Sequence, residues 1–207
     1  MSDLSKTDDL FFNRADMDLG RVESLAEDAL NGADDGELYL EYCQSEAVVF
    51  DDGQLKNASF NTSQGFGLRA VCGEVTGYSH ASELSEEAIK RAAETVKTVH
   101  AGQGGNMSSP PTGTNTQLYT DDNPLSLVEF ETKVKLLTDM DAYARSKDER
   151  VAQVSASLSG SWQAVQVIRP DGVRAADIRP LVRLNVTVMV AQGDRMETGS
   201  YGAGGRV

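Results

Sequence analysis

The sequence predicts an α+β fold, a two-layer sandwich in which three long helices pack on antiparallel or mixed β-meander sheets. Short β-prone runs separated by turn residues follow one another from Val48 to Ser82, as in an antiparallel meander. Runs with one apolar helical face flank these strands, and a helix followed by a meander occurs in both halves of the chain. Elements of this kind bury their apolar faces against one another in two layers.

Each expected helix has apolar residues recurring at helical spacing. The expected helices span residues 22–30, 86–99 and 126–146. Ser85 is well placed to cap the second helix, and Ser126 with Glu129 forms a capping-box pattern at the start of the third. Residues 1–18 are mostly polar, and we expect them to be loosely ordered.

The strands are expected to be short. They are predicted within residues 37–44, 48–50, 55–60, 66–72, 74–80, 154–159, 162–168, 173–178 and 183–190. Turn residues between them predict reversals at Asp51–Gly53, Gln64–Gly65 and Pro170–Gly172. The alternation of apolar and polar residues is clearest over residues 183–190, which predicts a half-buried strand there.

Residues 101–117 are rich in Gly, Ser, Pro and Thr and form the expected linker. They divide the chain into possible sub-halves at residues 19–100 and 118–207. The halves are similar in pattern, which indicates either an internal duplication or two uses of a common helix-plus-meander arrangement. The glycine-rich end at 199–207 carries no cap or closing helix, so we expect a fragment whose catalytic domain lies downstream.

The composition restricts the partners. The chain has 207 residues and a net charge of −13, which argues against nucleic acid because phosphate binding needs a basic face. The N-terminus lacks a basic, then apolar, secretory leader, and the sequence has no apolar run of about 18 residues for a membrane span. We therefore expect a cytoplasmic protein with Cys43 and Cys72 as reduced thiols.

Two glycine patterns suggest ligand sites only superficially. Gly65–Ala70 matches the dinucleotide pattern GxGxxG/A, but the continuation is strand-like rather than helical, so a turn or bulge is the better interpretation. Gly202–Gly205 lacks the Lys-Ser/Thr of a phosphate-binding loop, and we expect a loop or hinge there.

The chain shows no evident active site. Cys43, Cys72 and His80 could form a zinc site only if separate strands converged, because no local ligand pair is present. Neither His80 nor His100 begins a His-Glu-x-x-His pair. We therefore predict no catalytic, cofactor-binding or metal-ligating residue.

Several segments of the chain resemble the TldD/PmbA family, and their pattern is similar to the TldD branch rather than the PmbA (TldE) branch. The segments that carry the resemblance are Asp51–Gly53, Gly65–Tyr78, Asp141–Arg145, Arg150–Leu158, Asp177–Val186 and Gly199–Arg206. The resemblance covers about residues 20–207, nearly the whole chain.

The resemblance implies a cytosolic zinc-dependent peptidase that works as a heterodimer of TldD- and TldE-type subunits. Such enzymes degrade or mature short or unfolded peptides, and an older label for them is modulator of DNA gyrase. The family's zinc ligands lie in a His-Glu-x-x-x-His helix and a later cysteine, none of which occurs in this sequence. The chain would then be an inactive N-terminal α/β domain that frames the substrate cavity and contacts the partner.

Arg69, Gly199, Tyr201, Gly202 and Gly204 are our candidates for lining that cavity. An extended peptide could add to an exposed strand edge there. A second hypothesis is a non-catalytic TldE/PmbA-like partner or binding module. A third, a self-contained cofactor-binding enzyme, would require a ligand that the sequence does not indicate.

Overall fold

The computed structural model describes residues 3–100, 105–110, 118–170 and 172–206. The helical elements are α1 (Asp3–Asp8), the π-helical turn η1 (Asp9–Asn13), α2 (Leu19–Leu30), α3 (Glu86–His100) and α4 (Phe130–Lys147). The strands are β1 (Asp35–Asp51), β2 (Gln54–Cys72), β3 (Val75–Ala81), β4 (Val151–Ile168), β5 (Arg174–Gln192) and β6 (Arg195–Gly205).

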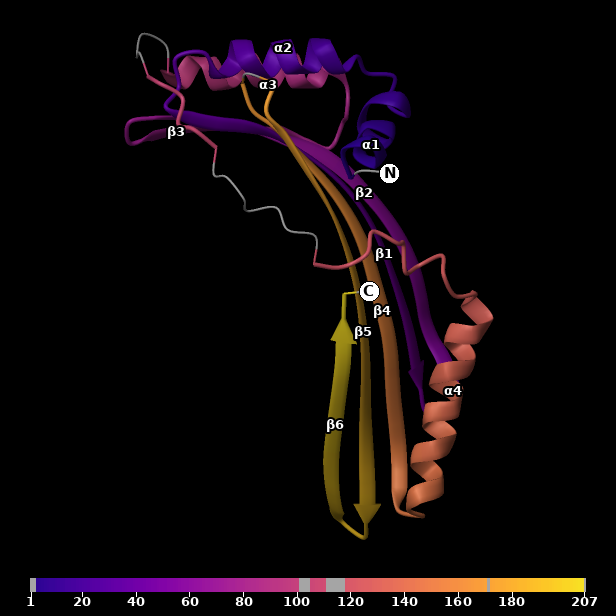
Figure 1. Ribbon diagram of the computed structural model, residues 1–207. Coiled ribbons are helices and arrows are strands. Elements are labelled where there is room, and N and C mark those ends of the chain that lie inside the picture. The colour runs from indigo at the N-terminus through magenta and orange to yellow at the C-terminus, as the bar shows by residue number, and fades with distance from the viewer. Residues whose placement is uncertain (1–2, 101–104, 111–117, 171, 207) are drawn as a thin grey trace. The chain divides into compact units, whose positions relative to one another are not determined.

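The six strands of the described chain form one antiparallel sheet in the order β3-β2-β1-β4-β5-β6 (Figure 1). Each outer strand follows its neighbour through a hairpin, with Cys72 opposite Val75 and Gln192 opposite Arg195. The predicted α+β class and the antiparallel meander are therefore confirmed.

The strands are longer than the sequence suggested. Gln64 and Gly65 lie inside β2, so the turn expected there is wrong. A Cβ at Gly65 would lie 2.7 Å from the Ala81 carbonyl oxygen, so this glycine allows a close approach of two backbones rather than a reversal.

One other expected turn has the geometry of a reversal. The hairpin after β1 holds Asp52 at φ +50° and Gly53 at φ +77°, which confirms the turn at Asp51–Gly53. The expected turn at Pro170–Gly172 includes Asp171, which lies outside the described residues. Gly172 of this segment has φ +68°.

The chain divides into two compact units. Unit 1 comprises residues 1–43, 63–118 and 163–178, and unit 2 comprises residues 44–62, 119–162 and 179–207. Residues 101–104 and 111–117 of the expected linker lie outside the described residues, while Gly105 and Ser108 donate backbone hydrogen bonds to Gly32 and Asp34. The assignment of 19–100 and 118–207 as sub-halves of one N-terminal domain stays a prediction.

In unit 1, α2 and α3 lie side by side on one face of the sheet (Figure 1). Ser85 Oγ accepts a hydrogen bond from the Ala88 amide, so the predicted cap of α3 is confirmed. The expectation that residues 1–18 are loosely ordered is wrong for residues 3–13, because α1 and η1 form there. Phe11 and Phe12 are buried in the same core as the helices.

In unit 2, α4 packs on β1, β4 and β5, with Leu137 buried against Val48, Phe50 and Ala156. The helix begins at Phe130, four residues after Ser126, the predicted N-cap, and its N-cap is Glu129 instead. Ser126 instead belongs to a turn, where its hydroxyl donates to the Asn123 carbonyl oxygen at 3.1 Å.

Candidate functional site

The edge strand β6 contains four of the five predicted site residues: Gly199, Tyr201, Gly202 and Gly204. One side of β6 pairs with β5, and within the described residues no strand pairs with its other side. Every residue of β6 is exposed. The expectation of a loop or hinge at Gly202–Gly205 is therefore wrong, because these residues extend the sheet.

The glycines of β6 have different surroundings. A Cβ at Gly204 would lie 2.5 Å from the Val182 carbonyl oxygen, and one at Gly202 would lie 2.8 Å from Asn185 Oδ1. At Gly199, by contrast, a Cβ would meet nothing within 4 Å. Because Gly202 and Gly204 lack a side chain, the end of β6 can lie close to β5.

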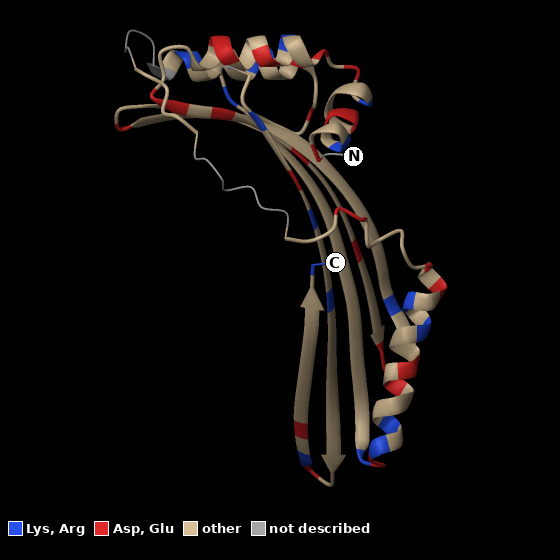
Figure 2. Cartoon of the chain, in the orientation of Figure 1, with Lys and Arg blue, Asp and Glu red and all other residues tan. Residues whose placement is uncertain are grey.

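The free edge of β6 has few charged and few large side chains. Arg195 and Glu197 at its start are its only charged residues, and the rest of the strand is uncharged (Figure 2). Tyr201 is the largest side chain and is 71% exposed. An edge with unpaired backbone groups and small side chains can pair with an extended peptide while selecting little of its sequence.

Unit 2 has a second open edge along the first part of β2. The register with β3 begins at Phe66, so Gln54–Thr62 has no outer strand among the described residues. Leu55 and Phe60 on this segment are 43% and 57% exposed. Among the described residues, both edges of the sheet in unit 2 are therefore unpaired.

A shallow recess of about 320 Å³ also lies on unit 2. Its wall combines Glu46, Ala47, Gly160, Leu181 and Arg183 with small polar side chains; the small polar residues are Ser45, Ser59, Asn61, Ser159 and Ser161. Hydroxyl and amide groups of this kind donate and accept hydrogen bonds and could contact a peptide backbone.

Arg69, the fifth predicted residue, lies on β2 in unit 1 and is held by acidic side chains. Its Nε donates to Glu37 Oε1 at 2.7 Å, and its Nη2 donates to Asp35 Oδ2 at 2.8 Å. These bonds, first to Glu37 and then to Asp35, raise the pKa of Arg69 above its usual range. The guanidinium is thus engaged within the fold, and its role in lining a substrate cavity stays a prediction.

Asp35 also binds Arg169, whose Nη1 lies 2.9 Å from Asp35 Oδ1. Burial would raise the pKa of Asp35, but hydrogen bonds from Arg69 and Arg169 outweigh it and lower the pKa below its usual range. The cluster of Asp35, Glu37, Arg69 and Arg169 fastens β1 to β2 and to the residue that follows β4. No local pattern in the sequence indicated this cluster, because its members lie far apart in the chain.

Cys72 and His80 point to opposite faces of the sheet, since Cys72 pairs with Val75 and Gly67 pairs with His80. Cys72 is buried and donates to the Gly32 carbonyl oxygen at 3.8 Å. Burial, and then the charge of Glu41, raises the pKa of the Cys43 thiol. No cluster of His, Cys, Asp or Glu in the described residues could hold a metal. In the described part of the chain, Cys72 and His80 therefore do not form the zinc site that the sequence left open.

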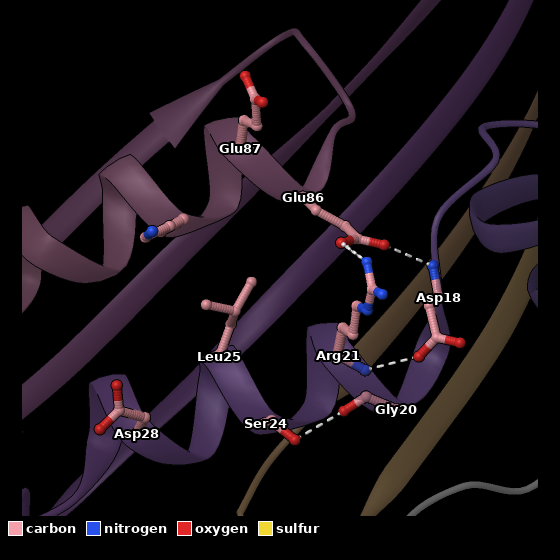
Figure 3. Close-up of a pocket in the computed structure, with 9 residues that line it drawn as sticks. Asp18, Gly20, Arg21, Ser24, Leu25, Asp28, Glu86 and Glu87 are labelled. Atoms are coloured by element: carbon pink, nitrogen blue, oxygen red, sulfur yellow. Dashed lines mark hydrogen bonds and ion pairs between the residues drawn. The ribbon is translucent and has the colours of Figure 1, made fainter.

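A groove of about 700 Å³ lies between α2 and α3, beside the N-terminal part of each helix (Figure 3). Glu86 accepts hydrogen bonds there from the Asp18 amide at 2.8 Å and from Arg21 Nη1 at 3.4 Å, while Asp18 Oδ1 accepts one from the Arg21 amide. These bonds join the starts of the two helices, which is a structural role.

Among the described helices, none has both the length and the apolar character that a membrane span requires.

Two family models match the chain in order. "PmbA/TldA metallopeptidase domain 1" matches residues 36–99, and "PmbA/TldA metallopeptidase central domain" matches residues 123–207.

Curated relatives match across both regions. A metalloprotease TldD homolog of Haemophilus influenzae is 40% identical over 176 residues, which cover 84% of this chain and 36% of that protein. One from Buchnera aphidicola is 35% identical over 174 residues, with the same coverage of 84% and 36%. The chain thus spans about a third of the length of these relatives.

Solved structures share the fold at low identity. TldE from Thermococcus kodakarensis aligns with a TM-score of 0.68 and 15% identity, covering 91% of this chain and 43% of that one. A Bacteroides thetaiotaomicron protein, described as a candidate modulator of DNA gyrase, gives a TM-score of 0.70 and 13% identity over 89% of this chain and 44% of that one. With both family models matched and a TldD homologue 40% identical, the chain belongs to the TldD/PmbA family of metallopeptidases.

Proposed function

We propose that this chain is the substrate-handling, non-catalytic N-terminal part of a zinc-dependent TldD-type metallopeptidase. The enzyme degrades or matures unfolded or short peptides in the cytoplasm, as a heterodimer with a TldE/PmbA-type subunit. The identity to proteins named metalloprotease TldD homolog supports the enzyme class. The observation that carries the role of this chain is the free, glycine-rich edge of β6.

In this proposal a peptide binds as an added strand along β6. Its backbone bonds to the outward N–H and C=O groups of β6, and the small side chains leave room for most sequences. Gly199, Tyr201, Gly202 and Gly204 flank the added strand. Zinc and the catalytic residues would come from a domain beyond this chain, since the cysteines and histidine described above do not fit a zinc site.

Backbone-modified peptides test strand addition directly. An unstructured ten-residue peptide carries N-methyl groups at alternating positions, so that one of its edges can no longer donate hydrogen bonds. A second version carries them at the intervening positions. We expect one version to lose binding to the chain in a fluorescence-anisotropy titration and the other to retain it. Equal binding of both versions would contradict strand addition.

A non-catalytic TldE/PmbA-like partner is the second candidate. The TldE fold from Thermococcus kodakarensis, with a TM-score of 0.68, favours it. The sequence of the whole gene product separates the two candidates. A His-Glu-x-x-x-His helix supports the peptidase, and its absence supports the partner.

A further inference from the structure

A separate recess of about 290 Å³ lies on unit 1, and the peptidase proposal gives it no role. We call it the Glu41 pocket. Its walls include Tyr39 and Glu41 of β1, Gly65 and Gly67 of β2, and Tyr78 and His80 of β3.

The glycines make space for an aromatic wall. A Cβ at Gly67 would lie 2.7 Å from Tyr78 Oη and 3.1 Å from its Cε2, so the Tyr78 ring lies over the bare backbone of this glycine. The ring also stacks with His80, with 5.5 Å between the ring centroids. Gly67 of the Gly65–Ala70 segment, which matches the dinucleotide pattern, thus makes room for the ring of Tyr78.

Glu41 supplies the only carboxylate among the described residues that line the pocket. Its Oε2 accepts hydrogen bonds from the Tyr39 hydroxyl and from Gln163 Nε2, both at 2.7 Å. Both bonds fix the orientation of the carboxylate. Its Oε1 has no donor among the described residues and stays free to accept one.

A half-buried carboxylate beside aromatic faces attracts a cation, because the ring quadrupoles and the negative charge act in the same direction. The shape of the donor decides which cation fits. A guanidinium binds a carboxylate best through two parallel bonds, which needs both oxygens, and here Oε2 is already used. An ammonium is a point charge and needs only Oε1.

We propose that the Glu41 pocket binds a primary ammonium group, carried by a lysine side chain or by the amino terminus of a peptide. The ammonium donates to Glu41 Oε1, and its alkyl stem lies against Tyr78. This binding requires no peptidase activity and no partner subunit.

The test uses small probes on the 207-residue chain. n-Butylammonium stands for a lysine side chain and glycinamide for a peptide amino terminus, with n-butanol and methylguanidinium as controls. We expect saturable shifts of the Glu41, Gly67 and His80 amide resonances with an ammonium probe, at a dissociation constant in roughly the millimolar range.

The two ammonium probes show whether the bound ammonium belongs to a lysine side chain or to a peptide amino terminus. Saturation by n-butylammonium alone indicates lysine, and saturation by glycinamide indicates an amino terminus. The absence of saturable shifts with either probe, or equal shifts with n-butanol, would overturn the proposal. So would tighter binding of methylguanidinium.

Variants locate the binding. Glu41→Gln keeps the size of the side chain but removes its charge, and should weaken n-butylammonium or glycinamide binding about fivefold or more. Glu149→Gln, the same change at an exposed residue of unit 2, should leave it unchanged. Unaltered binding by Glu41→Gln would refute the assignment. If that variant does not fold, nuclear Overhauser contacts between the probe and the Tyr78 ring in the unmodified chain decide the question.

Discussion

Lys133 is a buried lysine with all of its donors engaged. Its Nζ donates to both carboxylate oxygens of Glu46 at 2.9 Å and to the Leu125 carbonyl oxygen at 2.8 Å. The two side chains are 8% and 17% exposed, so the pair is shielded from solvent. It connects α4 to β1 within unit 2, where the sequence predicted only an apolar stripe.

Breaking this pair should be costly, since it leaves a buried charge alone. Glu46→Ala should lower the free energy of unfolding by about 3–5 kcal/mol, whereas the double variant Glu46→Leu with Lys133→Met should recover most of the loss. Urea titrations measure both. Lys135→Ala, which removes an exposed pair with Asp139, serves as the control and should cost about 0.5 kcal/mol or less. A double variant no more stable than Glu46→Ala would contradict this account.

The pKa of Asp35 predicts a pH dependence with a definite sign. Its folded-state pKa is lowered by Arg69 and Arg169, so its ionised form stabilises the fold above the unfolded-state pKa of about 3.9. That contribution is lost as the pH falls through the lower folded-state value. The difference in unfolding free energy between the unmodified chain and Asp35→Asn should therefore be larger at pH 7 than at pH 3. A difference that grows towards low pH would refute the assigned sign.

At the scale of elements, the sequence predicted where strands lie but not how far they run. Gln64–Gly65 has the composition of a turn, and its true role became visible only through contact with the end of β3. The same limit applies to β6, where glycines indicated a loop. Pairing with β5 makes it a strand, and such long-range pairing has no local signal.

The glycines of β6 provide a matched pair of substitutions. Gly204→Ala places a Cβ against the Val182 carbonyl oxygen and should cost about 1–3 kcal/mol of stability, because a backbone atom cannot move aside. Gly199→Ala enters open space and should be neutral or stabilise by up to about 1 kcal/mol. Thermal unfolding compares them. Equal melting temperatures would show that β6 does not pair with β5 in the described register.

At the scale of the whole molecule, family membership could be inferred from local motifs, whereas the arrangement of side chains could not. The cluster of Asp35, Glu37, Arg69 and Arg169 combines residues of β1, β2 and the segment after β4, and the Glu41 pocket combines residues of three strands. The two cores also differ in size. Among the described residues, the core of unit 1 includes 21 buried residues, and that of unit 2 includes four.

The small core of unit 2 predicts uneven stability. Leu137 is fully buried there, so Leu137→Ala should cost about 2–5 kcal/mol. Hydrogen exchange measured by mass spectrometry should speed up mainly in α4 and the neighbouring parts of β1, β4 and β5. Phe11→Ala in unit 1 is the counterpart and should speed up exchange mainly in α1, η1 and α2. Uniform acceleration of the whole chain by both variants would contradict separate cores.

The most direct test of the central claim is the zinc content of the purified 207-residue chain beside that of the whole gene product, with each assayed for cleavage of an unfolded peptide. Both assays are run with and without a TldE-type subunit. Our account predicts zinc and cleavage in the longer protein only. Stoichiometric zinc or cleavage in the 207-residue chain would contradict it, and so would a longer protein that neither holds zinc nor cleaves the peptide with its partner present.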